Sequence, residues 1–95
     1  MKRVISVLGS TGSIGRQTLE VARELGLPVA ALAARSSLEL LERQTREFHP
    51  KLVVLYEMEA ALELARRIRD LPVRVAYGME GLTEAAALEE ADTVV

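Results

Sequence analysis

The sequence predicts an α/β domain built on a doubly wound parallel sheet, and three observations carry that prediction. Five short apolar stretches, rich in Val, Ile and Leu, alternate with segments whose apolar residues recur at helical spacing. Strands joined by helices of this length need crossover connections, which place the strands parallel to one another. The strands are also apolar nearly throughout, so we expect helices to cover both faces of the sheet.

Each predicted element has a start or stop signal in the sequence. The predicted strands cover residues 3–8, 28–34, 51–56 and 73–77, and a fifth begins at about residue 92. The predicted helices cover about 12–25, 36–48, a stretch that begins near 58 and ends before Pro72, and 83–90. Gly26 and Pro28 end the first helix. Ser36 and Glu39 have the spacing of a capping box that opens the second helix.

The third helix is predicted from a stripe of apolar residues on one face, with a charged pair turned outward. The stripe consists of Met58, Ala61, Leu62, Ala65 and Ile68. Glu63 and Arg67 are four residues apart, the spacing of an ion pair on a helix surface. Further along, we expect a turn over residues 78–81 and a last helix capped by Thr83.

The composition excludes several classes of protein. The 95 residues form one domain at most, with 12 basic and 14 acidic side chains of mixed sign and no basic stripe, so we expect no nucleic-acid partner. The chain has no cysteine, which excludes disulfides and thiolate metal sites. No apolar run approaches the ~20 residues that span a bilayer, and no signal peptide is evident. We therefore expect a cytoplasmic protein with no membrane partner.

Three glycines at the end of the first strand predict a nucleotide phosphate site. Gly9, Gly12 and Gly15 follow a buried strand and open a helix, in the order that a dinucleotide-binding fingerprint requires. Glycine lets the main chain approach a pyrophosphate closely, and the helix N-terminus directs free N–H groups at the same anion. Thr11 and Ser13 add hydroxyl donors. A tight strand-to-helix turn without any ligand would also favour glycine, and the motif by itself does not name the dinucleotide.

The end of the second strand favours NADP(H) over NAD(H). An acid at this position usually binds the 2′-hydroxyl of the NAD ribose. Here the strand ends in Arg35, Ser36 and Ser37, a guanidinium and two hydroxyls that suit a 2′-phosphate. The alternatives are a solvated surface charge for Arg35 and simple helix capping for the two serines.

No residue of this chain is predicted to be catalytic or to bind a metal. His49, the one histidine, is next to Pro50 at a helix end, opposite the edge of the sheet where we expect the ligand. The spacing of the acidic residues is typical of a solvent-exposed helix face. The chain stops within an apolar strand. We therefore expect residues 1–95 to be the N-terminal dinucleotide-binding domain of a longer enzyme, whose catalytic and C-terminal domains are absent.

Several segments resemble the N-terminal part of the 1-deoxy-D-xylulose 5-phosphate reductoisomerase family, over essentially the whole chain. They are Val7-Leu8-Gly9-Ser10-Thr11-Gly12-Ser13-Ile14-Gly15, Gln17-Thr18-Leu19-Glu20-Val21, Ala31-Leu32-Ala33-Ala34, Phe48-His49-Pro50 and Leu52-Val53-Val54. The first of these, with its Gln-Thr-Leu continuation, is the most specific. The resemblance implies a Rossmann-like NADPH-binding domain.

The resemblance also implies an activity, partners and site residues. The family converts 1-deoxy-D-xylulose 5-phosphate to 2-C-methyl-D-erythritol 4-phosphate in non-mevalonate isoprenoid biosynthesis, by rearrangement and reduction with NADPH. It uses a divalent metal (Mg²⁺, Mn²⁺ or Co²⁺) and is typically homodimeric. By position, Thr11, Gly12, Ser13 and Ile14 would contact the pyrophosphate and ribose of the cofactor, and residues 35–37 the adenosine 2′-phosphate.

The sequence departs from the family at residues 35–37. The family usually has Gly, then Lys, Arg or Ser, then Asn, where this chain has Arg35, Ser36 and Ser37. Arg35 adds a cation that suits a phosphate, and Ser37 keeps a hydrogen-bonding side chain of shorter reach. Two other interpretations stay open: another NADP-linked reductase, such as a semialdehyde dehydrogenase, and a non-catalytic nucleotide-sensing module.

Overall fold

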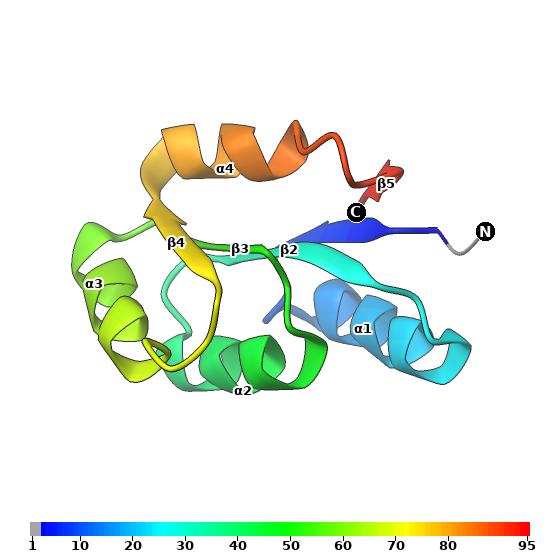
Figure 1. Ribbon diagram of the computed structural model, residues 1–95, viewed down its shortest axis with the longest axis horizontal. Helices are drawn as coiled ribbons and strands as arrows, with labels where there is room; N and C mark the ends of the chain where they lie inside the picture. The colour runs from blue at the N-terminus through cyan, green and yellow to red at the C-terminus, as the bar shows by residue number, and fades with distance from the viewer. Residues whose placement is uncertain (1–2) are drawn as a thin grey trace.

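Five parallel strands form one sheet in the order β4-β3-β2-β1-β5, in a computed structural model that describes residues 3–95 (Figure 1). The strands are β1 Ile5–Leu8, β2 Val29–Ala34, β3 Leu52–Leu55, β4 Arg74–Tyr77 and β5 Thr93–Val94. The helices are α1 Ser13–Leu25, α2 Leu38–Phe48, α3 Met58–Arg67 and α4 Gly78–Ala86. The predicted α/β fold with a parallel sheet is confirmed, including the fifth strand, which pairs with β1.

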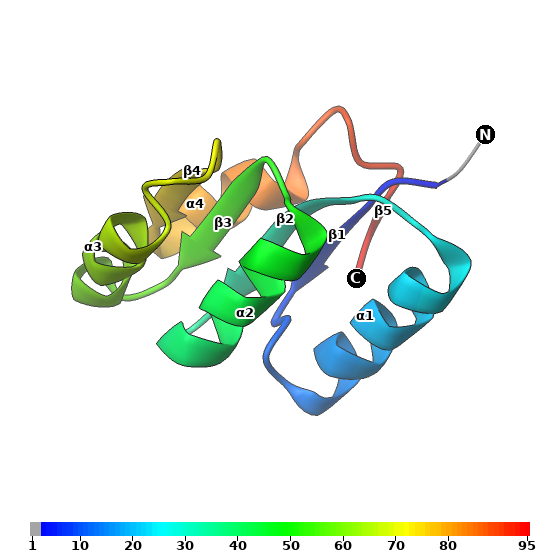
Figure 2. The same cartoon turned by 60° about the horizontal axis from the view of Figure 1, so that its bottom comes forward.

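The sheet is covered on both faces. Helices α1, α2 and α3 lie on one face, and α4 lies on the other (Figures 1 and 2). Every residue of β2 and β3 is buried, whereas the edge strand β4 is partly exposed. The near-continuous apolar strands of the sequence reflect this coverage, because a strand buried on both faces has no solvent side for polar residues.

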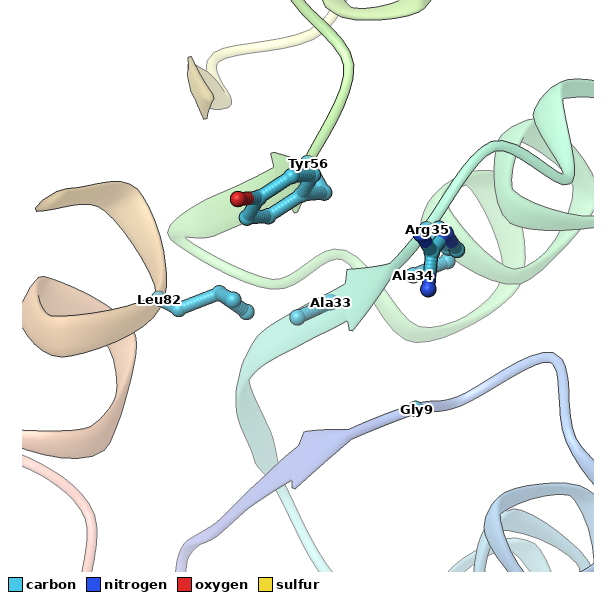
Figure 3. Close-up of a pocket in the computed structure, with 6 residues that line it drawn as sticks. All are labelled: Gly9, Ala33, Ala34, Arg35, Tyr56 and Leu82. Carbon is cyan, nitrogen blue, oxygen red and sulfur yellow. The ribbon is translucent and has the colours of Figure 1, made fainter. Parts of the chain in front are cut away.

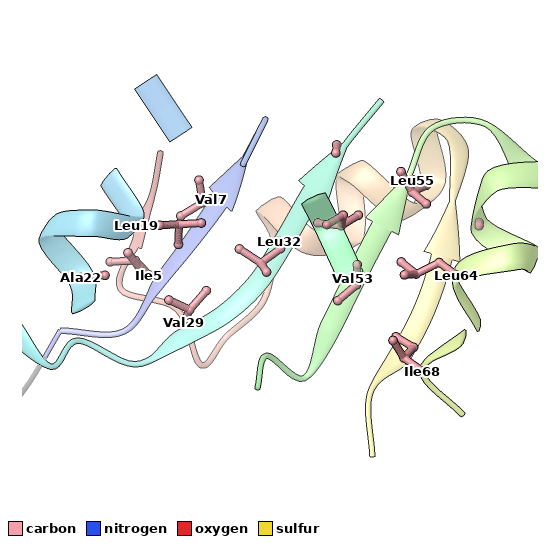
Figure 4. Close-up of a cluster of buried hydrophobic side chains, with 13 residues drawn as sticks. Ile5, Val7, Leu19, Ala22, Val29, Leu32, Val53, Leu55, Leu64 and Ile68 are labelled. Carbon is pink, nitrogen blue, oxygen red and sulfur yellow. The ribbon is translucent and has the colours of Figure 1, made fainter. Parts of the chain in front are cut away.

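Two hydrophobic clusters hold the layers together. The larger cluster joins alternate residues of the strands to α1, α2 and α3, with Val7, Leu32 and Val53 at its centre (Figure 4). The smaller cluster lies beneath α4 and includes Ala31 and Ala33 of β2. Burial of one leucine such as Leu32 contributes roughly 1.5–3 kcal/mol relative to an exposed position.

The helix ends follow the predicted signals more closely than the helix starts. Gly26 is the left-handed C-cap of α1, as expected. The capping-box prediction for α2 is wrong, because Ser37 is the N-cap residue and no side chain caps the helix. With Ser37 as the N-cap, the residue three positions on is Leu40, whose side chain has no polar group to bond the N-cap amide. Ser36 and Glu39 are therefore out of register for a box.

Helix α3 buries a narrower stripe than predicted. Its buried residues are Ala61 and Leu64, followed by Ile68 at the C-cap. Met58 and Leu62 are 50% and 62% exposed, so their assignment to the core face is wrong. The helix packs mainly on the edge strand β4, so less of its circumference meets the sheet. The outward pair of Glu63 and Arg67 is confirmed, with Nε–Oε2 at 3.2 Å.

The turn predicted over residues 78–81 is helical. Helix α4 begins at Gly78, directly after β4, with Tyr77 as its N-cap, and Thr83 lies inside the helix. Gly81 is needed for packing: a Cβ atom there would lie 2.8 Å from Cγ1 of Val54 on the sheet. The glycine therefore brings the helix close to β3. No helix of residues 3–95 is both long and apolar enough to cross a membrane.

Candidate functional site

The loop between β1 and α1 is anchored to the end of β2. We call residues 9–12 the glycine loop. The amides of Gly9 and Ser10 both donate to the carbonyl oxygen of Ala33, at 2.7 and 2.8 Å, and the Gly12 amide donates to the Gly9 carbonyl at 3.1 Å. Gly9 has a φ of +85°, a conformation that glycine adopts without steric cost. These bonds hold the loop at the carboxyl end of the sheet.

The third glycine of the motif lets α1 pack directly on this loop. A Cβ atom on Gly15 would overlap the carbonyl oxygen of Gly9 and would lie 2.8 Å from Cα of Ser10. Gly15 is buried, in the first turn of α1. The predicted strand, motif and helix are therefore confirmed as one unit, in which the spacing of the glycines has a packing reason.

A hollow lies over the N-terminus of α1. We call it the loop cavity; it has a volume of about 500 Å³ and is lined by Leu8, Gly9, Gly12, Ser13, Ile14, Gly15 and Val95. No side chain caps the helix at Gly12. The first amides of a helix have no partner within it and carry the positive end of its dipole. The loop cavity therefore suits an anion.

A second hollow lies where β2 and β3 end. This strand-end cavity has a volume of about 330 Å³ and is lined by Gly9, Ala33, Ala34, Arg35, Tyr56 and Leu82 (Figure 3). The Leu82 side chain points from α4 towards Ala33, and the Tyr56 ring follows directly after the end of β3. Gly9 lines both cavities, so they meet at the glycine loop. Each cavity has a volume in the range that small ligands occupy.

Among residues 3–95, Arg35 is the one whose charged side chain lines either cavity. It is exposed, and within residues 3–95 its guanidinium takes part in no ion pair. Its carbonyl oxygen accepts a hydrogen bond from the Glu57 amide at 3.4 Å, and the Ala34 carbonyl accepts one from the Tyr56 amide at 3.1 Å. These bonds fix the turn after β2 against the turn after β3.

The structure brings together part of the predicted site. Gly12, Ser13 and Ile14 line the loop cavity, and Arg35 lines the strand-end cavity. Thr11 is half-buried in the glycine loop and lines neither cavity, nor do the exposed Ser36 and Ser37 before α2. Ile14 is 72% exposed, a large apolar side chain uncovered beside the loop cavity.

Sequence reasoning missed Tyr56 and Leu82. Tyr56 follows the last residue of β3, and the carboxyl ends of neighbouring parallel strands meet at one edge of a sheet, which is a usable signal. Leu82 had no such signal, because the sequence predicted a turn over residues 78–81, where the structure has the start of the helix α4.

Asp70, Asp92 and His49 take part in contacts within the fold. Arg46 donates to Asp70 (Nη1–Oδ2 3.0 Å), and this hydrogen bond lowers the pKa of the Asp70 carboxyl. Asp92 Oδ2 accepts a hydrogen bond from the Val4 amide at 2.9 Å. His49 is the C-cap of α2, with a φ of +49°. Among the described residues, no three His, Asp or Glu side chains are grouped so that they would hold a metal ion.

Residues 5–95 match the sequence profile of the family described as 1-deoxy-D-xylulose 5-phosphate reductoisomerase. Curated relatives with this name include one from Lachnoclostridium phytofermentans, 61% identical over 94 residues, and one from Ruminiclostridium cellulolyticum, 47% identical over 95 residues. These matches cover 98% and 100% of this chain but 24% and 25% of the relatives. The chain therefore spans about a quarter of their length.

Solved structures share the fold at similar coverage. A DOX-P reductoisomerase in complex with magnesium has a TM-score of 0.94 and 32% identity, over 99% of this chain and 24% of that chain. A DOX-P reductoisomerase in complex with NADPH, fosmidomycin and magnesium has a TM-score of 0.90 and 32% identity, over 97% of this chain and 23% of that chain. The Zymomonas mobilis enzyme in complex with NADPH has a TM-score of 0.91 and 31% identity, over 99% and 25%.

Proposed function

This chain belongs to the 1-deoxy-D-xylulose 5-phosphate reductoisomerase family, and from that membership we propose that it is the NADPH-binding part of such an enzyme. The observation that carries the proposal is the pair of cavities that meet at Gly9, one over the N-terminus of α1 and the other beside Arg35. A dinucleotide has a pyrophosphate at its centre and an adenosine at one end. The loop cavity suits the first, and the strand-end cavity suits the second.

The residues around the glycine loop fit the pyrophosphate. Uncapped amides at the start of α1 supply hydrogen-bond donors, and the backbone is free of Cβ atoms at Gly9 and Gly12. In the proposal, Thr11, Gly12, Ser13 and Ile14 contact the pyrophosphate and the adjoining ribose. The exposed Ile14 supplies an apolar surface for the sugar.

The turn after β2 fits the adenosine end. In the proposal, Arg35 pairs with the 2′-phosphate, and Ser36 and Ser37 supply hydroxyl donors from the start of α2. The guanidinium at the rim of the strand-end cavity supports this role for Arg35, because within residues 3–95 it forms no ion pair and no acidic side chain lines either cavity. A carboxylate there would repel the phosphate.

The activity of the whole enzyme is part of the same proposal. The enzyme converts 1-deoxy-D-xylulose 5-phosphate, a sugar phosphate, to 2-C-methyl-D-erythritol 4-phosphate in isoprenoid biosynthesis, and bound NADPH supplies the hydride for the reduction. The proposal includes a homodimer in the cytoplasm, which sedimentation and cell fractionation test. It also includes a divalent metal, to which we assign no residue of this chain, because residues 3–95 hold no suitable group of ligands. No feature of the site favours a semialdehyde dehydrogenase or a nucleotide sensor.

Calorimetric titration of this chain with NADPH and, in parallel, NADH tests the proposal. We expect NADPH to bind more tightly, and we expect the difference to disappear in Arg35→Ala. A folded chain that binds neither nucleotide would contradict the proposal that residues 1–95 hold the cofactor.

A further inference from the structure

A buried glutamine of α2 forms a hydrogen bond with the backbone of the glycine loop. Gln44 is 6% exposed, and its Nε2 donates to the carbonyl oxygen of Ser10 at 2.8 Å. Ser10 is fully buried in the middle of the glycine loop. The two residues are 34 positions apart in the sequence, so this bond ties the loop to a separate element of the fold.

Ser10 is held through both of its backbone polar groups. Its amide donates to the carbonyl of Ala33 on β2, and its carbonyl accepts from Gln44 on α2. The residues that follow are Thr11 and Gly12, which lead into the free amides of α1. The bonds to Ala33 and Gln44 together hold the Ser10 backbone, and so they set the direction in which the chain continues towards Thr11.

Burial alone does not account for glutamine at this position. Among the described residues, the side-chain oxygen of Gln44 and the hydroxyl of Ser10 have no hydrogen-bond partner. A buried amide that uses only one of its polar groups is less favourable in a core than an aliphatic side chain of the same size. Within residues 3–95, the one hydrogen bond of the Gln44 side chain is the one that its Nε2 donates to the glycine loop.

Helix α2 also begins at the other half of the site. Its N-cap, Ser37, follows Arg35 and Ser36 directly, and Gln44 lies about two turns further along the same helix. A rigid helix therefore connects the residues at the strand-end cavity to the residue that holds the glycine loop.

We propose that Gln44 is a positioning residue, which holds the glycine loop in the conformation that receives the pyrophosphate. The inference rests on the proposed function, because the pyrophosphate belongs to the nucleotide. Since NADPH and NADH share the pyrophosphate, loss of the Gln44 donor lowers the affinity of the chain for both nucleotides by the same factor. We expect about tenfold, which corresponds to the net contribution of one hydrogen bond. Arg35→Ala, in contrast, changes the ratio of the two affinities.

The test compares Gln44→Met with Thr45→Val. Methionine keeps the length of the side chain and removes the donor. Thr45 is the matched control, because it is also buried on α2, and its hydroxyl donates to the Leu41 carbonyl within the same helix, at 2.8 Å. Two measurements are made on each chain: amide hydrogen exchange of residues 9–13 without ligand, and calorimetric titration with NADPH and NADH.

We expect Gln44→Met to exchange faster in the glycine loop and to bind both nucleotides about tenfold more weakly. Thr45→Val is expected to keep the exchange of the loop and both affinities within twofold. Equal effects of the two substitutions would show a merely structural role and overturn the inference, as would unchanged exchange in Gln44→Met. If Gln44→Met does not fold, Gln44→Asn, which shortens the reach by one methylene, replaces it with the same expected results.

The two proposals fail separately. If the unsubstituted chain binds neither nucleotide, the proposed function fails, and the exchange of residues 9–13 in the two variants still decides whether Gln44 orders the loop. If the unsubstituted chain binds NADPH and Gln44→Met binds it equally well, only the role of Gln44 fails.

Discussion

The carbonyl oxygen of Gly9 occupies the space that a Cβ atom on Gly15 would need. Gly9 is the first residue of the glycine loop and Gly15 lies in the first turn of α1, so the helix and the loop are in direct backbone contact. A side chain of any size at residue 15 would separate them.

Gly15→Ala is therefore expected to lower the free energy of unfolding by about 1–3 kcal/mol, the usual cost of adding a methyl group to a closely packed site. It is also expected to weaken NADPH binding, because the loop must shift. Gly12→Ala is the control for stability, since a Cβ there meets the Gly9 oxygen at an ordinary 3.5 Å. Denaturant unfolding measures both variants, and equal midpoints for Gly15→Ala and the unsubstituted chain would contradict the prediction.

Arg35→Ala is expected to weaken NADPH binding about 10- to 100-fold, because a hydrogen bond to a charged group contributes roughly 1.5–3 kcal/mol. NADH binding is expected to change little, since NADH has no 2′-phosphate. Arg35→Lys keeps the charge and is expected to retain part of the preference. Titration with both nucleotides measures the ratio of affinities, and equal losses for both would remove Arg35 from the 2′-phosphate site.

Tyr56→Ala is expected to weaken the binding of both nucleotides about tenfold, because a base that stacks on an aromatic ring gains roughly 1–3 kcal/mol of binding free energy. Tyr56→Phe keeps the ring and is expected to bind normally. Tyr77→Ala serves as the matched control: it removes another exposed tyrosine, at the end of β4, that does not line the strand-end cavity. If Tyr77→Ala weakened binding as much as Tyr56→Ala, the assignment of the adenine to this cavity would be wrong.

Leu32→Ala is expected to destabilise the protein by about 2–5 kcal/mol, since it leaves a cavity at the centre of the larger cluster. Leu62→Ala removes a leucine that is mostly exposed on α3, and its effect is expected to stay within about 0.5 kcal/mol. Chemical denaturation compares the two. A large loss of stability in Leu62→Ala would instead support the wider buried face that the sequence pattern of α3 predicted.

Asp70→Asn is expected to be less stable than the unsubstituted chain at neutral pH, by a small amount, because the pair with Arg46 is at the surface. The hydrogen bond from Arg46 lowers the pKa of Asp70 in the folded protein, so its stabilisation is present above the ordinary value of 3.8. This stabilisation is lost as the pH falls through the lowered pKa. The two unfolding curves should therefore converge below pH 3.8, and a difference that stays constant down to pH 2 would exclude this ion pair as its source.

The sheet and the glycine loop were predictable from the sequence because their signals are local. Apolar runs mark the strands, Gly26 marks the end of α1, and the spacing of Gly9, Gly12 and Gly15 follows from contacts within one strand–loop–helix unit. The same holds for the order of the elements, since short connections leave few arrangements of a parallel sheet.

The parts that were not predictable depend on contacts between distant segments. Gly81 has the appearance of a turn residue, but it is a site of close packing against Val54, which no neighbouring residue indicates. Leu82 reaches the strand-end cavity only because α4 crosses the face of the sheet that the other helices leave open (Figure 1). Gln44 likewise has the sequence context of an ordinary helix residue, and only the fold places it under Ser10.

The face of β2 that lies beneath α4 presents only the methyl groups of Ala31 and Ala33. Ala33 is also one of the residues that line the strand-end cavity. Ala33 is fully buried beneath α4, so a branched residue at 33 would press on that helix and narrow the cavity. Room for a ligand beside Arg35 and Tyr56 therefore depends in part on a residue that offers it no polar group, and a change of its methyl to an isopropyl would reduce that room.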